Sequence, residues 1–139
     1  MKSSIAMSLA AVAAIGITVS AGVPAAGAKG HSCKAIAKFD RNGDGRLSIF
    51  EAKRAGRATF NALNPDGDFT LEYAEVRGRI GPKTFDRYNR IKRKGLDRIE
   101  WTRLVRARFY AANPDGDRTI ECNELYTPAG RRLMAVIAY

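Results

Sequence analysis

Apolar residues recur at helical spacing in several short segments of the chain, and polar segments rich in Asp, Asn and Gly separate these segments. The best-defined apolar stripe falls in residues 101–112 and consists of Trp101, Leu104, Val105 and Phe109. This spacing predicts a helix, because one face of a helix carries residues three and four apart. We expect the stripe to lie in the core, since such stripes form core far more often than ligand sites.

Four weaker segments predict further helices. They cover residues 32–39, 52–63 and 76–88, and the C-terminal segment from Pro128 onward. Gly81 and Pro82 should split the third of these segments, because proline breaks the hydrogen bonding of a helix interior. Thr127 and Pro128 provide an N-cap and a first-turn proline for the last helix. The pattern therefore predicts a small all-α bundle.

The polar segment at residues 40–51 matches the twelve-residue calcium loop of an EF-hand. In such a loop, oxygen ligands come from positions 1, 3, 5, 7, 9 and 12, with a backbone carbonyl at position 7. These positions hold Asp40, Asn42, Asp44, Arg46, Ser48 and Glu51. Gly45 provides the positive φ needed at position 6, and Leu47 at position 8 should point into the core. An Asp/Asn/Gly turn before a helix is the alternative, but it does not explain Glu51 and Leu47 together.

The same loop pattern recurs at residues 64–75, 89–100 and 113–124, so the loops repeat every 24 or 25 residues. Candidate ligands are Asn64, Asp66, Asp68, Thr70, Glu72 and Glu75 in the second loop, and Asn113, Asp115, Asp117, Thr119, Glu121 and Glu124 in the fourth. Only twelve or thirteen residues separate consecutive loops, which leaves room for a single shared helix. The apolar residues at position 8 should pair as short β-bridges; they are Leu47, Leu71, Leu96 and Ile120.

The later loops depart from the pattern. In the third loop, Ile91 and Arg93 occupy positions 3 and 5, and five basic against two acidic residues give the window a charge of +3, so no cation is expected there. In the second and fourth loops, Phe69 and Arg118 occupy position 6, where a left-handed backbone is needed. Holding such residues there costs about 1–2 kcal/mol, so we expect these two loops to bind metal more weakly than an intact loop.

The charge distribution supports this assignment of the loops. The 139-residue chain has a formal net charge of +10, yet thirteen of its fourteen acidic residues fall within the four loops. The acidic residues are therefore placed for oxygen ligation, whereas most basic residues occupy the connecting segments and the third loop.

Residues 1–28 predict a secretory signal peptide, because Lys2 precedes an apolar run that ends in the small residues Ala26, Gly27 and Ala28. A membrane anchor is the alternative, although Ala, Gly and Ser dilute the run. The mature domain would then cover residues 29–139, with no membrane span and with a periplasmic or secreted location.

Export bears on the two cysteines, Cys33 and Cys122, because thiols in an oxidising compartment tend to pair. A bond between them would close a loop over most of the domain and stabilise it by roughly 4 kcal/mol. Two unconnected buried thiols are the alternative. The pair lacks the Cys-x-x-Cys spacing of redox or zinc chemistry.

From about Phe39 to its end, the chain resembles the lanmodulin family of exported bacterial EF-hand proteins. The resemblance rests on four loops joined by single helices, on Asn-Pro-Asp at Asn64 and Asn113, and on Thr-Pro-Ala-Gly from Thr127. It implies a compact helical bundle whose loops bind metal, with a proline at position 2 associated with lanthanide-binding loops.

Two features of the second and fourth loops bear on that implication. Pro65 and Pro114 match the proline at position 2, whereas arginine stands there in the first and third loops. Both loops also keep four carboxylates, against three in the first loop. Four carboxylates suit a trivalent cation better, because Coulomb attraction scales with both charges.

These observations leave three functional hypotheses. The first is an exported protein that binds Ca²⁺ mainly at the first loop. The second is lanthanide binding at the second and fourth loops. The third is a basic interaction module for an anionic surface or an acidic protein, with the EF-hands as scaffold. Basic residues that merely solvate helix surfaces are an equally open interpretation, and nucleic acid is not an expected partner of an exported protein.

An enzyme is not expected. His31 is the only histidine, and no Ser/His/Asp or Cys/His arrangement can be assembled from the sequence. The carboxylates are assigned to the loops rather than to acid–base catalysis.

Overall fold

The computed structural model describes residues 33–91 and 94–139. Of these residues, 56% are helical, and two small antiparallel sheets accompany the helices. The helices are α1 (Lys34–Ala37), α2 (Ile49–Leu63), α3 (Tyr73–Val76), α4 (Pro82–Tyr88), α5 (Arg98–Ala112), α6 (Cys122–Leu125) and α7 (Pro128–Ile137). The strands are β1 (Leu47–Ser48), β2 (Thr70–Glu72), β3 (Gly95–Asp97) and β4 (Thr119–Ile120). The mainly helical character predicted from the sequence is confirmed, although the sheets mean that the fold is not strictly all-α.

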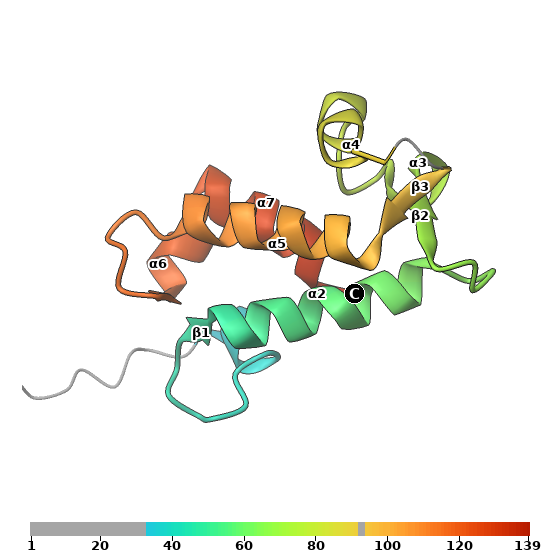
Figure 1. Ribbon diagram of the computed structural model, residues 1–139. Helices are drawn as coiled ribbons and strands as arrows, with labels where there is room; N and C mark the ends of the chain where they lie inside the picture. The colour runs from blue at the N-terminus through green and yellow to red at the C-terminus, as the bar shows by residue number, and fades with distance from the viewer. Residues whose placement is uncertain (1–32, 92–93) are drawn as a thin grey trace, which may run out of the picture.

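Helices α2 and α5 lie side by side at the centre and run in opposite directions, and α7 packs against both (Figure 1). Their facing stripes hold the largest fully buried side chains, Trp101, Phe60 and Phe109. Trp101 donates its indole N–H to the carbonyl of Gly56 at 2.9 Å, so its one polar atom is satisfied in the core. A Cβ on Gly56 would lie 2.7 Å from a methyl group of Val105, so glycine permits this close helix packing despite its low helix propensity.

The two long helices begin with the same device. Ser48 caps α2 and Asp97 caps α5, and in each case the glutamate three residues later donates its backbone N–H to the cap and accepts the backbone N–H of the capping residue. Such reciprocal caps satisfy amide groups that would otherwise lack partners at a helix start. Each helix start is thereby tied to the polar segment that precedes it.

The two sheets connect four twelve-residue segments, which we call loops 1 to 4: residues 40–51, 64–75, 89–100 and 113–124. Strand β1 pairs with β4, with Leu47 opposite Ile120, and β2 pairs with β3, with Leu71 opposite Leu96. All four side chains are fully buried, which confirms the predicted pairing of the position-8 residues. The two sheets lie at opposite ends of the α2–α5 pair (Figure 1). Loops 1 and 4 therefore form one end of the molecule and loops 2 and 3 the other.

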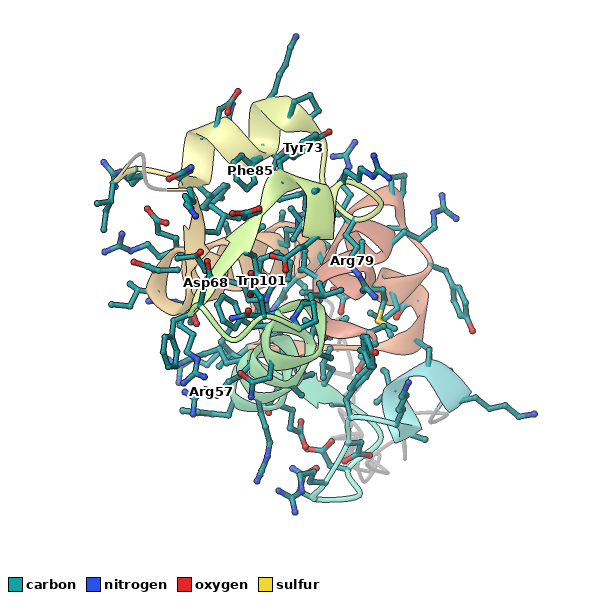
Figure 2. The ribbon with its side chains drawn as sticks, turned by 90° about the vertical axis from the view of Figure 1, so that its right-hand side faces the viewer. Arg57, Asp68, Tyr73, Arg79, Phe85 and Trp101 are labelled. Atoms are coloured by element: carbon teal, nitrogen blue, oxygen red, sulfur yellow. A yellow bond between two sulfur atoms is a disulfide. The ribbon has the colours of Figure 1, made fainter. Side chains whose placement is uncertain are left out.

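The segment between loops 2 and 3 is split as predicted, since α3 ends at Val76 and α4 begins at Pro82. Phe85 anchors α4 to the core side of the molecule and is buried. Its ring meets the ring of Tyr73 edge to face, with 5.4 Å between the centroids (Figure 2). This contact fixes α4 against the start of α3.

The disulfide left open by the sequence is present, between Cys33 and Cys122 with 5.8 Å between their Cα atoms. It ties the start of α1 to the start of α6 across 89 residues of chain. The alternative of two unconnected thiols is therefore wrong. The predicted cap of the last helix is also confirmed, because the Thr127 hydroxyl accepts the N–H of Gly130 at 3.0 Å and Pro128 begins α7.

Three parts of the sequence interpretation lie outside the described residues. They are the signal peptide at residues 1–28, His31, and Lys92 and Arg93 of loop 3. Across residues 33–91 and 94–139, every helix is too short or too polar to span a bilayer.

Candidate metal centre

Loop 1 curls so that the carboxylate of Asp40 meets backbone amides from its own turn. One carboxylate oxygen accepts the N–H of Gly43 at 2.7 Å, and the other accepts the N–H of Gly45 at 2.8 Å. Both glycines have positive φ, 72° and 77°, which lets the chain turn back beneath Asp40. These bonds hold position 1 of the loop over the turn.

Glu51 closes loop 1 by joining its two ends. Its Oε1 accepts the N–H of Arg41 at 2.9 Å, and its Oε2 accepts the N–H and the hydroxyl of Ser48 at 2.9 and 2.8 Å. Between these ends, Asp44 accepts the N–H of Arg46 at 2.8 Å and the amide of Asn42 at 2.7 Å. All six residues predicted as ligands therefore sit on one turn whose shape is fixed by its own hydrogen bonds.

Loops 2 and 4 are near copies of each other in structure as well as in sequence. In each, the Asn at position 1 accepts the N–H of the Gly at position 4, at 2.9 Å in loop 2 and 2.8 Å in loop 4. The Asp at position 5 accepts both the N–H and the hydroxyl of the Thr at position 7, at 2.8 and 2.9 Å in both loops. The predicted ligands of these loops thus lie on two turns of the same construction.

Position 2 distinguishes these loops from loop 1. In loop 1, the N–H of Arg41 at position 2 donates to Oε1 of Glu51 at 2.9 Å. In loops 2 and 4, Pro65 and Pro114 occupy position 2 and have no N–H to donate. Glu75 and Glu124 keep the equivalent bond from position 9, at 2.8 and 2.9 Å to Oε2, but cannot receive the one from position 2. Proline therefore leaves one oxygen of the closing carboxylate without its backbone competitor.

Like charges crowd the closing glutamates. Burial raises the pKa of Glu75, the N–H of Glu72 lowers it, and the other three carboxylates of loop 2 raise it further. The pKa of Glu124 is raised in the same way, by burial first and then by the three other carboxylates of loop 4. A cation among these oxygens would relieve that repulsion.

Phe69 and Arg118 adopt the left-handed backbone expected at position 6, with φ of 67° and 76°. They are the only non-glycine residues with positive φ in the described ranges. The Phe69 side chain is 70% exposed, so packing contributes little to offset the strain. Loops 2 and 4 therefore keep the loop shape at a local cost of about 1–2 kcal/mol each.

Loop 3 has the same closure with a different set of side chains. Glu100 is buried and accepts the N–H groups of Arg90, Ile91 and Asp97, at 2.7, 3.2 and 3.1 Å. The backbone amides thus satisfy the closing carboxylate in a loop that has Ile91 where loop 1 has a ligand. The closure between residues 89–91 and 97–100 therefore does not depend on a full ligand set.

The Arg46 side chain is a feature that sequence reasoning missed, because only its backbone carbonyl was assigned a role. Its Nη1 lies 3.3 Å from Asp117 and its Nη2 lies 2.9 Å from Glu121. Within residues 33–91 and 94–139, these are the only ion pairs. Leu47 pairs with Ile120 in antiparallel register, so Arg46, which precedes Leu47, lies beside Glu121, which follows Ile120. The contact depends on the pairing of loop 1 with loop 4, which the sequence pattern does not specify.

Arg46 places a cation beside two predicted ligands of loop 4. The bonds from Thr119 lower the pKa of Asp117 most, burial opposes them, and the charge of Arg46 lowers the pKa to a lesser extent. In loop 2, the residue opposite Glu72 is Gly95, which has no side chain. The two otherwise similar loops thus differ in the residue beside position 9, which is Arg46 for loop 4 and Gly95 for loop 2.

The donor chemistry fits a hard cation, although the side chains are not gathered as a finished cluster. In the part of the chain that the structure describes, no three Asp, Glu, His or Cys side chains form a metal-ligand group. The carboxylates of the acidic loops accept backbone amides instead, as in the bonds to Asp40 and Glu51. The donors are carboxylate, amide, hydroxyl and carbonyl oxygens, which are the ligands that Ca²⁺ prefers.

Comparison with known proteins adds no family to this description. No family model matches the sequence, and no curated protein matches it at a significant level. A functional assignment therefore has to proceed from the loops and from the surfaces around them.

Proposed function

We propose that the chain is an exported EF-hand protein that binds Ca²⁺ mainly through loop 1 and is not an enzyme. The observation that carries this proposal is the closure of loop 1 by Asp40 and Glu51, which are held at opposite sides of one turn by four backbone N–H groups. The loop spacing shared with the lanmodulin family supports the same assignment.

Calcium suits loop 1 for two reasons. Ca²⁺ takes six to eight oxygen ligands, and the loop offers three carboxylates, an amide, a hydroxyl and the Arg46 carbonyl. Its position 6 is glycine, so the turn carries none of the strain found at Phe69 and Arg118. We expect a dissociation constant of about 10⁻⁴ to 10⁻³ M, since exported EF-hand modules usually bind calcium weakly.

Calorimetric titration of the protein with Ca²⁺ tests this proposal. We expect saturable binding that is abolished by Asp40→Ala and by Glu51→Gln, because each removes a carboxylate from loop 1. Asp86→Asn is the matched control, because Asp86 is the one acidic residue outside the loops and lies exposed on α4. Absence of saturable binding, or binding that survives both loop 1 substitutions, would overturn the assignment.

Lanthanide binding at loops 2 and 4 is the second candidate function. It is favoured by the prolines at position 2, which leave an oxygen of Glu75 and of Glu124 without a backbone donor. Four carboxylates in each loop also favour a trivalent ion over a divalent one. Metal at loop 2 should be visible through Tyr73, which lies within that loop.

Terbium emission provides the test of this second function. Excitation of the protein at micromolar Tb³⁺ should give sensitised emission, and Tyr73→Phe should remove the part that comes from loop 2. No emission, or emission that is unchanged by both Tyr73→Phe and Glu75→Gln, counts against lanthanide binding at loop 2.

Export is supported by the Cys33–Cys122 disulfide, because such bonds form and persist in oxidising compartments. The signal peptide predicted at residues 1–28 supports it independently. Mass spectrometry of protein recovered from outside the cytoplasm should give the mass of a chain that starts near Lys29 with the disulfide intact. Recovery of full-length, reduced chain from the cytoplasm alone would contradict export.

A further inference from the structure

Four arginines line one cavity on the helical body of the molecule. The cavity measures about 540 Å³ and lies between the α3–α4 turn, α4, α5 and α7. The arginines are Arg79, Arg87, Arg108 and Arg132. Its apolar lining comes mainly from Ile80, Leu104, Ala107, Ala111 and Ala129. Among the described residues, no Asp or Glu contributes to the lining. The volume falls in the range of about 300–1,000 Å³ typical of small-molecule sites.

Two of the four guanidinium groups are held in place by the backbone of α7. Arg79 donates through Nη1 to the carbonyls of Ala135, at 3.1 Å, and Ala138. Figure 2 shows Arg79 beside the ribbon of α7. Arg108 donates through Nη1 to the carbonyl of Arg132. Each anchored group keeps further N–H donors, and donors that are already positioned lose little freedom when a ligand binds.

The other two arginines extend without a partner in the described part of the chain. Within the described residues, the Arg87 and Arg132 side chains make no hydrogen bond or ion pair. Both ion pairs of these residues are formed by Arg46. Burial lowers the pKa of Arg108 and the charge of Arg132 lowers it further, against the opposite effect of Tyr88. Positive charge therefore accumulates around the cavity, and no carboxylate is among its described lining residues to balance it.

We propose that this cavity binds a phosphate-bearing organic ligand, with the phosphate held by the arginines and an apolar portion resting on Ile80, Leu104 and Ala111. The planar guanidinium fork matches a phosphate with two parallel N–H bonds. A phosphate carries up to two negative charges, so four arginines favour it over a single carboxylate. The apolar lining favours a ligand with a hydrocarbon part over inorganic phosphate. The site is separate from the acidic loops and does not require metal.

An NMR titration with phenyl phosphate tests the site, with the amides of Thr84, Ala107 and Ala111 as reporters of the cavity. We expect saturable shifts at these amides, with and without EDTA, and at least tenfold weaker binding of inorganic phosphate. Benzyl alcohol, which keeps the ring but has no charge, should not saturate. Shifts that stay linear in phenyl phosphate up to high concentration would overturn the proposal.

Paired variants separate the cavity from the general positive charge of the protein. Arg87→Gln with Arg132→Gln should weaken phenyl phosphate binding at least tenfold. Arg103→Gln with Arg106→Gln removes the same charge from exposed positions of α5 outside the lining and should change it less than twofold. Equal weakening in the two double variants would show non-specific attraction and overturn the proposal. Ala111→Asp, which puts a carboxylate into the cavity, is a second way to abolish binding if the first double variant fails to fold.

A vesicle experiment separates the two sources of such a phosphate. If the ligand is a lipid headgroup, the protein should bind phosphatidylglycerol vesicles, and Arg87→Gln with Arg132→Gln should release it while Arg103→Gln with Arg106→Gln does not. If the ligand is a free phosphate ester, phenyl phosphate binds but both double variants bind vesicles equally. The proposal fails if neither probe distinguishes the two double variants.

Discussion

Loops 2 and 4 share eight of their twelve residues and the same internal hydrogen bonds, yet they face different neighbours. Loop 2 lies against loop 3, which presents Gly95 opposite Glu72. Loop 4 lies against loop 1, which presents Arg46 at 2.9 Å from Glu121. The pairing of the strands therefore gives two loops of similar sequence different neighbours, an arginine side chain at loop 4 and a glycine at loop 2.

The difference leads us to expect that the affinity of a loop for a cation depends on its neighbouring loop as well as on its own ligand set. The guanidinium of Arg46 already neutralises part of the charge on Asp117 and Glu121, so a metal ion at loop 4 has to compete with it. Among the described residues, no ion pair engages a carboxylate of loop 2. We therefore expect cations to occupy loop 1 first, loop 2 second and loop 4 last.

The largest expected effect concerns the disulfide, which reaches the loop 4 end through Cys122 at the position where loop 2 has Tyr73. Replacing Cys33 and Cys122 together with Ser should lower the free energy of unfolding by roughly 4 kcal/mol, because the bond closes a long loop in the unfolded chain. Urea unfolding measures the loss. Hydrogen exchange should accelerate at Gly116 more than at Gly67. Equal acceleration at the two glycines would show that the bond does not distinguish the two ends.

The next effect concerns Gly95, which lies opposite Glu72 in the pairing of β2 with β3. A Cβ there would lie 2.4 Å from the backbone carbonyl of Leu71, so Gly95→Ala should separate β2 from β3 and lower stability by about 1–3 kcal/mol. Gly78→Ala is the matched control, because nothing lies within 4 Å of a Cβ at that position. If the two variants unfold at the same urea concentration, position 95 tolerates a side chain and the predicted clash with the backbone of Leu71 is wrong.

The effect on metal affinity should be smaller. Arg46→Ala should strengthen metal binding at loop 4 about three- to tenfold, since each exposed ion pair that the metal must replace contributes up to about 1 kcal/mol. The amide shifts of Gly116 and Gly67 in a La³⁺ titration report the two loops separately. Arg106→Ala removes the same charge from an exposed position on α5 and should change neither loop by more than about twofold. Equal strengthening by Arg46→Ala at both loops would refute local competition.

The smallest expected effect is on the pH dependence of stability without metal. Because the pKa of Glu75 is raised on folding, the folded chain holds this proton to higher pH than the unfolded chain does. The contribution of Glu75 to stability therefore falls as the pH rises from its ordinary pKa through the raised one. Glu75→Gln should remove that fall, so its stability relative to the wild type should increase with pH in urea unfolding with EDTA.

Loop 4 provides the comparison for this pH effect. The pKa of Glu124 is raised, but that of Asp117 is lowered. An acid whose pKa is lowered on folding contributes stability that is lost as the pH falls through its folded pKa. The two groups thus oppose each other in loop 4. A relative stability of Glu75→Gln that falls as the pH rises would contradict the assignment.

Local rules explain the part of this structure that the sequence predicted. Helix α5 follows from its apolar stripe, the break at Pro82 from proline chemistry, and the start of α7 from the cap at Thr127. The pairing of Leu47, Leu71, Leu96 and Ile120 also follows, because each is the apolar residue of a repeated loop. These features depend on residues close together in the chain.

The features that sequence reasoning missed depend on which elements meet. Nothing in the repeat states that loop 1 pairs with loop 4, so the contact of Arg46 with Asp117 could not be placed in advance. Arg108 lies outside the apolar stripe of its helix, yet it is half-buried and donates to the backbone carbonyl of Arg132 in α7. In both cases a basic side chain is held by a specific partner, a carboxylate for Arg46 and a backbone carbonyl for Arg108.

The most direct test of the account is an NMR titration of the protein with Ca²⁺ that follows the amides of Gly45, Gly67 and Gly116, one in each acidic loop. We predict that Gly45 shifts saturably at the lowest calcium concentration, that Gly67 follows, and that Gly116 responds last because Arg46 competes there. A Gly45 amide that does not respond, or a Gly116 amide that saturates before Gly67, would contradict the account.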